Sequence, residues 1–281
     1  MSFTPAEQLL YTTTRITGFG PKGHYSLGTG FFYQVVVQPE PLLVSTVLIT
    51  NRHVIAGCDE IELTLPLRNG DQLPSDKLCR WRHPFAEYRI DHPEPDVDLV
   101  AINVTGWHHR EANGELTYPF YIPLSAEAIP QPEAWSSFDA IEEVTMVGCP
   151  NGLFDETNNL PIVRRGITAT HPGRNYQGKE ELMVDLACFP GSSGSPIFLY
   201  STGTRYDRAS GGFSIGSIQL YLLGVLYSGP VINQRGQVVL TQPATVHTAA
   251  MMHLGNAIKS TKLLAFDDLI RRQFNTQASN A

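Results

Sequence analysis

A serine flanked by glycines is the residue of this chain best suited to chemistry. Ser193 lies in the segment CFPGSSGSPIF (residues 188–198), just ahead of an apolar run. Gly191 has no Cβ and can lie beside a reacting carbonyl, and Gly194 lets the chain turn into the following strand. We expect an oxyanion hole of Gly191, Ser192 and Ser193, with the N–H groups of Gly191 and Ser193 converging on one oxygen. Alone, the segment would also fit an ordinary Gly/Ser turn.

A histidine and an aspartate earlier in the chain could complete this chemistry. The segment VLITNRHVI (residues 47–55) is a buried-strand pattern that ends in His53, and DVDLVAI (residues 96–102) places a carboxylate before a second apolar run. Ser193 would attack a carbonyl, His53 would take its proton, and Asp98 would fix the tautomer of the imidazole. Asp96 is the rival for the acid, because strand alternation puts both aspartates on one face. The order His, Asp, Ser is one of the known orders for such triads.

Short strands are the elements expected to position these residues. Apolar runs alternate with turn signals, which is typical of antiparallel barrels; the runs cover residues 31–37, 42–50, 60–65, 99–104, 144–148, 183–187, 196–199 and 218–226. After Pro243, apolar residues recur at spacings of about 3.6 and predict a helix packed on a second barrel. These residues are Ile258, Leu263, Phe266, Ile270 and Phe274.

Four motifs together carry a family resemblance. They are GTGFF (residues 28–32), MVGCPNG (146–152), RGIT (165–168) and GSSGSP (191–196). With His53 and Asp98, they make the chain resemble trypsin/chymotrypsin-type serine peptidases over roughly residues 25–255. The likeness is greatest to the bacterial trypsin-like branch, with its HtrA-like and glutamyl-endopeptidase-like enzymes. It favours Asp98 over Asp96, because the acid of the family directly precedes the apolar run.

The resemblance implies a fold and a division of the chain. The expected fold is all-β, with two six-stranded antiparallel Greek-key barrels (chymotrypsin-like) and a C-terminal α-helix. Both barrels would form one peptidase unit. The expected parts are an N-terminal extension (1–24), a first barrel with His53 and Asp98 (25–130), a second barrel with Ser193, the oxyanion hole and the substrate pocket (131–255), and a C-terminal helix and tail (256–281).

A primary substrate pocket also follows from the resemblance. Because no acid stands at its base, a preference for Lys or Arg is not expected, and a small or medium apolar side chain is the leading candidate. His247 is a further candidate for the pocket, although a structural role is favoured for it. The expected lining comprises Ala187 at the base, Cys188 on one wall, and Tyr227, Ser228 and Gly229 on the other.

Ser192 sets this chain apart from the digestive members of the family. Those enzymes pair a freed N-terminal ammonium with an aspartate directly before the nucleophile, whereas a serine hydroxyl cannot form such an ion pair. A buried ammonium without a counter-charge would be unfavourable. We therefore expect no proteolytic activation step. Either the loop around Gly191, Ser192 and Ser193 (the oxyanion loop) is formed as synthesised, or a partner orders it.

Composition and charge narrow the partners. The chain of 281 residues has 42% apolar residues and a net charge of −7, which argues against a nucleic-acid partner. No apolar run approaches the ~18–20 residues of a membrane helix, so no membrane partner is expected. A protein or peptide substrate is the expected partner, and a protein activator or regulatory partner is a further expectation. We expect no cofactor.

Cysteine usage indicates the compartment. The four cysteines, at positions 58, 79, 149 and 188, form no C-x-x-C pair and have no zinc-ligand spacing, so we expect free thiols and no metal. Residues 1–20 lack a basic start followed by an apolar core, the pattern of a secretory signal. We predict a cytoplasmic protein. A secreted form with its signal removed stays as the alternative.

These expectations combine into one function. We predict a serine endopeptidase that hydrolyses peptide bonds through an acyl-enzyme, intracellular and either constitutively active or gated by a partner. The alternative is a catalytically silent or scaffold-type binding module on the same fold. A pseudoenzyme usually lacks a triad residue, and His53, Asp98 and Ser193 are all present.

Overall fold

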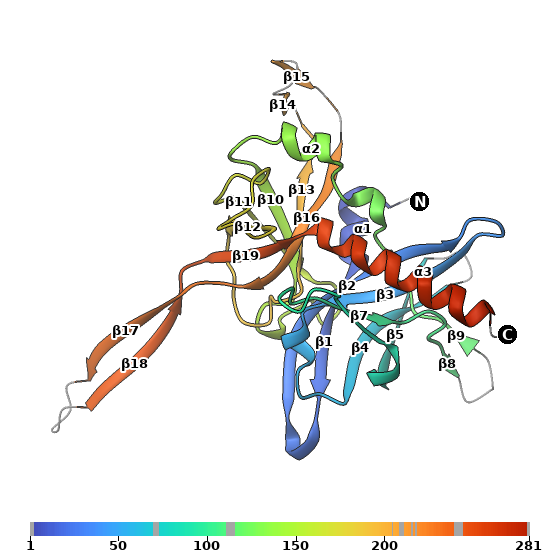
Figure 1. Ribbon diagram of the computed structural model, residues 1–281. Coiled ribbons are helices and arrows are strands. Elements are labelled where there is room, and N and C mark those ends of the chain that lie inside the picture. Colours follow the sequence, from blue (N-terminus) through green and yellow to red (C-terminus); the bar gives the residue numbers. More distant parts are fainter. Residues whose placement is uncertain are drawn as a thin grey trace.

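The N-terminal half of the chain folds into one antiparallel sheet. The computed structural model describes residues 3–69, 73–110, 116–203, 205–207, 211–214, 216, 218–238 and 244–279. Seven strands lie in the order β5-β4-β1-β2-β3-β7-β6 (Figure 1). They are β1 (Thr13–Phe19), β2 (Tyr25–Gln38), β3 (Leu43–Thr50), β4 (Glu60–Arg68), β5 (Pro74–Pro84), β6 (Arg89–Asp91) and β7 (Val100–Asn103).

The C-terminal half closes into a barrel. Six strands follow one another in the order β10-β11-β12-β19-β16-β13, and β13 returns to pair with β10. They are β10 (Glu143–Gly148), β11 (Ile162–Thr168), β12 (Glu181–Asp185), β13 (Pro196–Ser201), β16 (Gln219–Ser228) and β19 (Leu254–Lys259).

The predicted fold class is confirmed, and one half differs in detail. The second barrel has six strands, as predicted. The first half is a seven-stranded sheet because the short strand β6 adds to the outer edge of β7, with Ile90 opposite Ala101.

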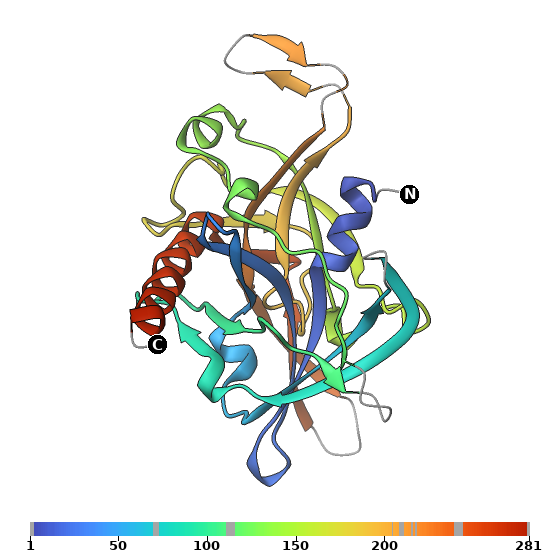
Figure 2. The ribbon, with the colours of Figure 1, turned by 90° about the vertical axis from the view of Figure 1, so that its right-hand side faces the viewer.

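Hairpins and helices complete the chain. In Figures 1 and 2 the hairpin of β14 and β15 projects beyond the second barrel. No helix within the described ranges is long and apolar enough to cross a membrane. The hairpins are β8 (His109–Arg110) with β9 (Leu116–Thr117), β14 (Arg205–Asp207) with β15 (Gly212–Ser214), and β17 (Val231–Val238) with β18 (Ala244–Met251); the α-helices are α1 (Pro5–Thr12), α2 (Pro132–Ser137) and α3 (Leu264–Ser279).

Alternation in the sequence explains how strands face the core. Along β4, Ile61, Leu63 and Leu65 are buried while the residues between them are only half-buried. Successive side chains of a strand point to opposite faces, so this pattern buries one face. The buried face joins residues of β2, β3 and β7 in the core of the N-terminal half.

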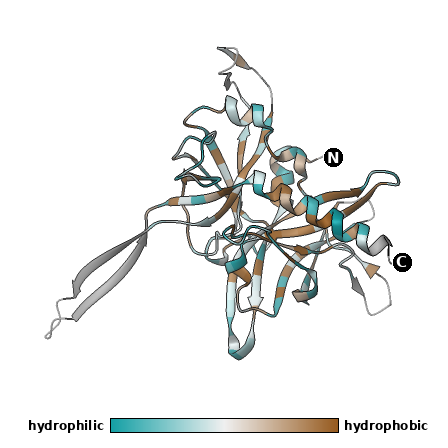
Figure 3. Ribbon diagram, viewed as in Figure 1, coloured by the Kyte–Doolittle hydropathy of each residue, from teal (hydrophilic) through white to brown (hydrophobic). Residues whose placement is uncertain are grey.

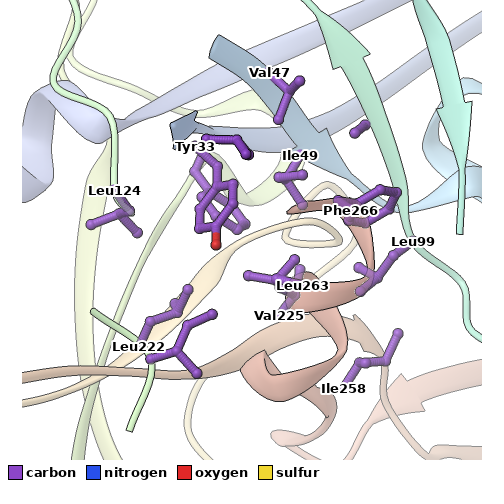
Figure 4. Packing of buried hydrophobic residues seen from close by; sticks show 14 of the residues in the cluster. Tyr33, Val47, Ile49, Leu99, Leu124, Leu222, Val225, Ile258, Leu263 and Phe266 are labelled. Carbon is purple, nitrogen blue, oxygen red and sulfur yellow. The ribbon is translucent and has the colours of Figure 1, made fainter. Parts of the chain in front are cut away.

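A second core joins the two halves. Figure 4 shows Tyr33 and Ile49 of the N-terminal sheet packed close to Leu222 and Val225 of the barrel. Phe266 of α3 belongs to the same buried cluster. Because apolar surface from both halves is buried together, the halves form one unit and their residues keep a fixed relative geometry.

The C-terminal helix packs on both halves. We expected it on the second barrel, and Phe266 and Ile270 do share a buried cluster with barrel residues, but α3 also contacts β2 of the N-terminal sheet. The Tyr33 hydroxyl donates to Asp267 Oδ1 at 2.9 Å, and Arg271 Nε donates to the Val36 carbonyl at 3.1 Å. Figure 3 shows apolar and hydrophilic residues alternating on α3, which is typical of a helix lying on a core. Ile258, expected in the helical pattern, lies in β19 instead.

Two of the expected boundaries between parts of the chain do not coincide with those in the structure. Residues 1–24 were predicted as an extension, yet β1 lies between β2 and β4, with Thr17 opposite both Leu27 and Glu62. At the other end, the boundary between residues 255 and 256 cuts through β19, which is a strand of the closed barrel. Backbone pairing decides both cases, because each strand supplies hydrogen bonds to two neighbours.

Candidate active site

His53 is held at the end of a buried strand. Strand β3 leads into a 3₁₀ turn, η2 (Arg52–Ile55), and Val54 and Ile55 of that turn are buried. These two apolar side chains anchor the turn on the core of the N-terminal half. The imidazole of His53 points the other way, with 48% of its side chain exposed. A buried strand therefore presents one titratable ring to solvent.

Asp98 holds His53 by two contacts. Its Oδ2 lies 2.5 Å from His53 Nδ1, and its Oδ1 accepts the backbone N–H of His53 at 3.2 Å. The buried amide of Asn51 donates to the Asp98 carbonyl at 2.8 Å, which fixes the acid from its own backbone. With a carboxylate as acceptor, Nδ1 carries the proton and Nε2 is left with a lone pair.

Asp96 does not share this position. The expectation that alternation puts Asp96 and Asp98 on one strand face is wrong, since β7 begins only at Val100 and both residues precede it. Asp96 is exposed and lines a cavity of about 430 Å³, together with Glu94, Glu180 and Glu181. The structure brings Asp98, and not Asp96, to His53.

Ser193 lies in a sharply turned loop that only glycines permit. Gly194 has φ +87°, and a Cβ there would lie 1.9 Å from the Thr29 carbonyl oxygen. The Ser193 hydroxyl donates to the Tyr227 carbonyl at 3.4 Å. In the part of the chain that the structure describes, no hydrogen bond joins Ser193 to His53.

Two backbone N–H groups of this loop have no backbone acceptor among the described residues. The Pro190 carbonyl accepts from Asn151 N at 2.6 Å, and the Ser192 carbonyl accepts from Ser195 N at 3.0 Å. In a trans peptide, N–H and C=O point in opposite directions. The N–H groups of Gly191 and Ser193 therefore point away from Asn151 and Ser195, the residues whose N–H groups bond the carbonyls of these two peptides.

Ser192 has a different place from the one predicted. We expected it among the oxyanion-hole residues, but its N–H donates to the Phe189 carbonyl at 3.0 Å. Its side chain is fully buried and accepts a hydrogen bond of 3.0 Å from the Arg164 guanidinium. The same guanidinium also donates to the Ala187 carbonyl. Sequence analysis missed Arg164, although a cation between Ile162 and Gly166, the residues that share its strand face, was a signal.

Cys188, expected on one wall of the primary pocket, lies in the core of the barrel. Cys188 and Leu226 are buried in one apolar cluster. A Cβ built on Gly255 would lie 2.5 Å from both Cys188 Sγ and Leu226 Cδ1, so the side chains at this point of the core are closely packed. Ala187 and Gly229 are half-buried, and Ser228 is exposed and accepts from Asn256 Nδ2 at 3.3 Å.

Tyr227 connects this wall to an acidic cavity. Its hydroxyl donates to Glu181 Oε2 at 2.9 Å, and burial together with this carboxylate raises the pKa of Tyr227 to about 12. His247, the other candidate for the pocket, lies in β18 opposite Arg235 of β17, in a hairpin separate from the barrel. The side chain of His247 lies outside the described residues.

The described side chains offer no metal site. Over the described ranges, no group of three or more His, Cys, Asp or Glu residues is placed to hold an ion. The four cysteines are free thiols. Burial raises the pKa of Cys149 to about 12 and that of Cys188 to about 11, so both thiols are protonated at neutral pH. What this arrangement offers chemically is a hydroxyl, an imidazole with an oriented carboxylate, and the N–H groups of Gly191 and Ser193, which have no backbone acceptor among the described residues.

The chain matches one known family. The sequence model of the trypsin-like peptidase domain covers residues 28–204, a range that contains His53, Asp98 and Ser193. No curated protein matches the chain.

Similar solved structures include three proteins. A mutant of the tobacco etch virus protease is 10% identical, with a TM-score of 0.45 over 92% of this chain and 78% of that one. The protein GrC is 14% identical, with a TM-score of 0.47 over 97% of each chain. HL collagenase is 14% identical, with a TM-score of 0.39 over 76% of this chain and 88% of that one.

Proposed function

Since the chain belongs to the family of trypsin-like peptidase domains, we propose that it is a serine endopeptidase that acts through His53, Asp98 and Ser193. The observation that carries this proposal is the contact of 2.5 Å between His53 Nδ1 and Asp98 Oδ2. An imidazole oriented in this way presents Nε2 as a base, which is what a serine nucleophile requires.

Each group has one role in the proposed reaction. Ser193 Oγ turns from the Tyr227 carbonyl, attacks the peptide carbonyl carbon and gives its proton to His53 Nε2. The N–H groups of Gly191 and Ser193 stabilise the oxyanion that forms. His53 then delivers the proton to the leaving amine, and an acyl-enzyme on Ser193 remains. Water attacks the acyl group with His53 again as base, which releases the acid and restores the serine.

Asp98 acts on the imidazole and not on the substrate. Its carboxylate holds the Nδ1 proton in place and stabilises the imidazolium that forms when Nε2 accepts the serine proton. The second contact, from the His53 N–H to Asp98 Oδ1 at 3.2 Å, limits rotation of the carboxylate. The orientation of the imidazole matters as well as the charge of the carboxylate, because a misplaced base transfers the proton poorly.

We also propose a reducing compartment for the enzyme. Its four cysteines are free thiols, and two of them, Cys149 and Cys188, are buried. Proteins of oxidising compartments more often pair such residues in disulfides. Cysteines that form no disulfide favour an intracellular location.

Labelling with a fluorophosphonate tests the peptidase proposal. The purified chain should be labelled at Ser193, and Ser193→Ala should abolish both labelling and peptide hydrolysis. The matched control is Ser195→Ala, because this hydroxyl is buried and has no hydrogen-bond partner among the described residues. It should keep both activities. Full hydrolysis by Ser193→Ala would refute the assignment, and labelling that appears only after addition of cell lysate would indicate a gating partner.

The choice of Asp98 as the acid that orients His53 is tested separately. Asp98→Asn should lower kcat by about four orders of magnitude near neutral pH, because an amide favours the wrong tautomer of His53. Asp96→Asn should change kcat by only a few-fold, since Asp96 is exposed and does not contact His53. The reverse ranking would give the role of the acid to Asp96.

A further inference from the structure

One cation lies behind the oxyanion loop. Arg164 is in β11, and its guanidinium donates to the Ala187 carbonyl and to Ser192 Oγ, the latter at 3.0 Å. Ala187 and Ser192 stand at the two ends of a short segment that also contains Gly191. A single planar group with several donors in fixed directions therefore connects both ends of the loop.

This cation has no counter-charge nearby. Within the described ranges no ion pair joins Arg164 to a carboxylate, and the ionisable groups that act on it are the thiols of Cys188 and Cys149. Both thiols are protonated at neutral pH, because burial raises their pKa values. Burial lowers the pKa of Arg164 itself, and its buried Nε has no partner in the described part of the chain.

A cation held in this way is unfavourable for folding alone. Moving a charge out of water without a paired anion costs free energy, and an unpaired buried donor adds to that cost. Locally unfavourable features of this kind are expected at functional sites. The unpaired arginine therefore calls for an explanation at the loop that it contacts.

We propose that Arg164 is a positioning residue that keeps the oxyanion loop in its catalytic form, a role that rests on the proposed peptidase function. By holding Ser192 Oγ, Arg164 fixes the turn in which Ser192 N donates to the Phe189 carbonyl. We expect that turn to fix the peptide planes that carry the N–H groups of Gly191 and Ser193, neither of which has a backbone acceptor among the described residues.

A consequence concerns activation. In the digestive enzymes that the chain resembles, a cation reaches the loop only after cleavage frees an N-terminal ammonium. Here the cation is a side chain of β11, and it is present as soon as the barrel folds. The oxyanion loop then needs neither cleavage nor a partner to become ordered. Of the two expectations raised by Ser192, a loop formed as synthesised is the one we favour.

Kinetics separate this role from a purely structural one. Arg164→Ala should lower kcat for peptide hydrolysis by ~100-fold or more, which is the scale for loss of an oxyanion donor, and change KM much less. Added methylguanidinium should restore part of kcat, because it can occupy the space of the lost side chain. Arg165→Ala is the matched control, since its neighbouring guanidinium is exposed and pairs with Glu143. It should keep kcat and show no response to methylguanidinium.

Hydrogen exchange of the intact chain gives a readout that does not depend on activity. In Arg164→Ala, protection should be lost at the amides of Ser192, Gly194 and Ser195, while β10 and β16 stay protected. In Arg165→Ala all of these amides should exchange as in the wild type. A wild-type chain without labelling or hydrolysis, both alone and after addition of cell lysate, would refute the peptidase function, and exchange would still decide the role of Arg164. Unchanged exchange in the loop, or a kcat of Arg164→Ala within a few-fold of wild type, would overturn the proposal.

Discussion

The Thr29 hydroxyl donates to the Gly191 carbonyl at 2.9 Å, and so a strand of the N-terminal half holds the oxyanion loop of the C-terminal half. Thr29 is fully buried in β2, and its Oγ1 also accepts from Cys149 N at 3.0 Å. Its own N–H donates to the Ser193 carbonyl at 2.9 Å. Two hydrogen bonds donated by Thr29 therefore hold the loop against the half that carries His53, and a third, accepted from Cys149, ties Thr29 to the segment after β10.

Removal of this hydroxyl should weaken both stability and catalysis. Thr29→Val keeps the shape of the side chain but leaves the Gly191 carbonyl and the Cys149 N–H without a partner. The expected loss is ~1–3 kcal/mol in the free energy of unfolding, measured in urea. We also expect kcat to fall by more than about tenfold, because small displacements of a catalytic loop are costly. Thr29→Ser retains the hydroxyl and should stay near wild type. An unchanged kcat in Thr29→Val would show that the loop does not depend on Thr29.

From the close packing around Cys188 and Leu226 we expect a preference for small side chains in the primary pocket. Cys188 Sγ and Leu226 Cδ1 both border the position of a Cβ on Gly255, at 2.5 Å. Peptides with alanine before the scissile bond should therefore be cleaved with a higher kcat/KM than peptides with phenylalanine. Cys188→Ala removes one sulfur atom and should reduce this ratio by about tenfold, which is the usual effect of one heavy group in an apolar pocket. Cys58→Ala, remote from the pocket, should leave the ratio unchanged. A wild-type preference for phenylalanine would contradict this description of the pocket.

The candidate catalytic residues could be proposed from the sequence because each lies beside a strong local signal. His53 follows a buried strand, Asp98 precedes one, and Ser193 lies between glycines. Strand β1 could not be predicted in this way. Its sequence, TTRITGF, has few apolar residues, and its central place depends on pairing with β2 and β4. Such pairing depends on residues distant in sequence, and a local pattern does not contain that information.

Contacts between distant segments were also beyond prediction. Arg164 and Ser192 lie on different elements, and only the closed barrel brings the guanidinium to the hydroxyl. For the same reason only part of the packing of α3 was predicted: its apolar face was visible in the sequence, but its bond to Tyr33 of β2 was not. Periodicity shows that a face is buried and does not show what covers it.

Because β1 lies inside the N-terminal sheet, deleting it and adding a tag before it should have different effects on the protein. Deletion of residues 1–19 removes β1 and with it the buried side chain of Ile16, and leaves β2 and β4 with unpaired edges. We expect that variant to lose the cooperative unfolding transition in circular dichroism. A tag placed before Met1 should leave kcat/KM within a few-fold of wild type, because no buried N-terminal ammonium is required. A folded and more active deletion variant would instead point to an inhibitory N-terminal segment.

The last prediction concerns the carboxyl group that joins α3 to β2. Burial raises the pKa of Asp267 above its usual 3.8, although the Tyr33 hydroxyl and Arg271 oppose the shift. Between the unfolded and folded pKa values, the folded state holds a proton that the unfolded state has released. The contribution of this group to stability is therefore complete below pH 3.8 and is lost as the pH rises through the folded pKa.

Asp267→Asn removes this titration. The difference in the free energy of unfolding between the variant and wild type should therefore depend on pH. The free energy of unfolding of the variant, minus that of wild type, should increase between about pH 3.5 and about pH 7, because only the wild type pays for ionisation of the buried carboxyl. Any constant effect of the amide on the Tyr33 hydrogen bond cancels in this comparison. Asp268→Asn is the matched control, with a side chain that is 71% exposed, and its difference from wild type should vary much less with pH. Urea unfolding at the two pH values measures both differences. If the difference for Asp267→Asn decreased with pH, the carboxylate would be stabilised by Tyr33 and Arg271 more than burial destabilises it, and the helix would be held to β2 by charge.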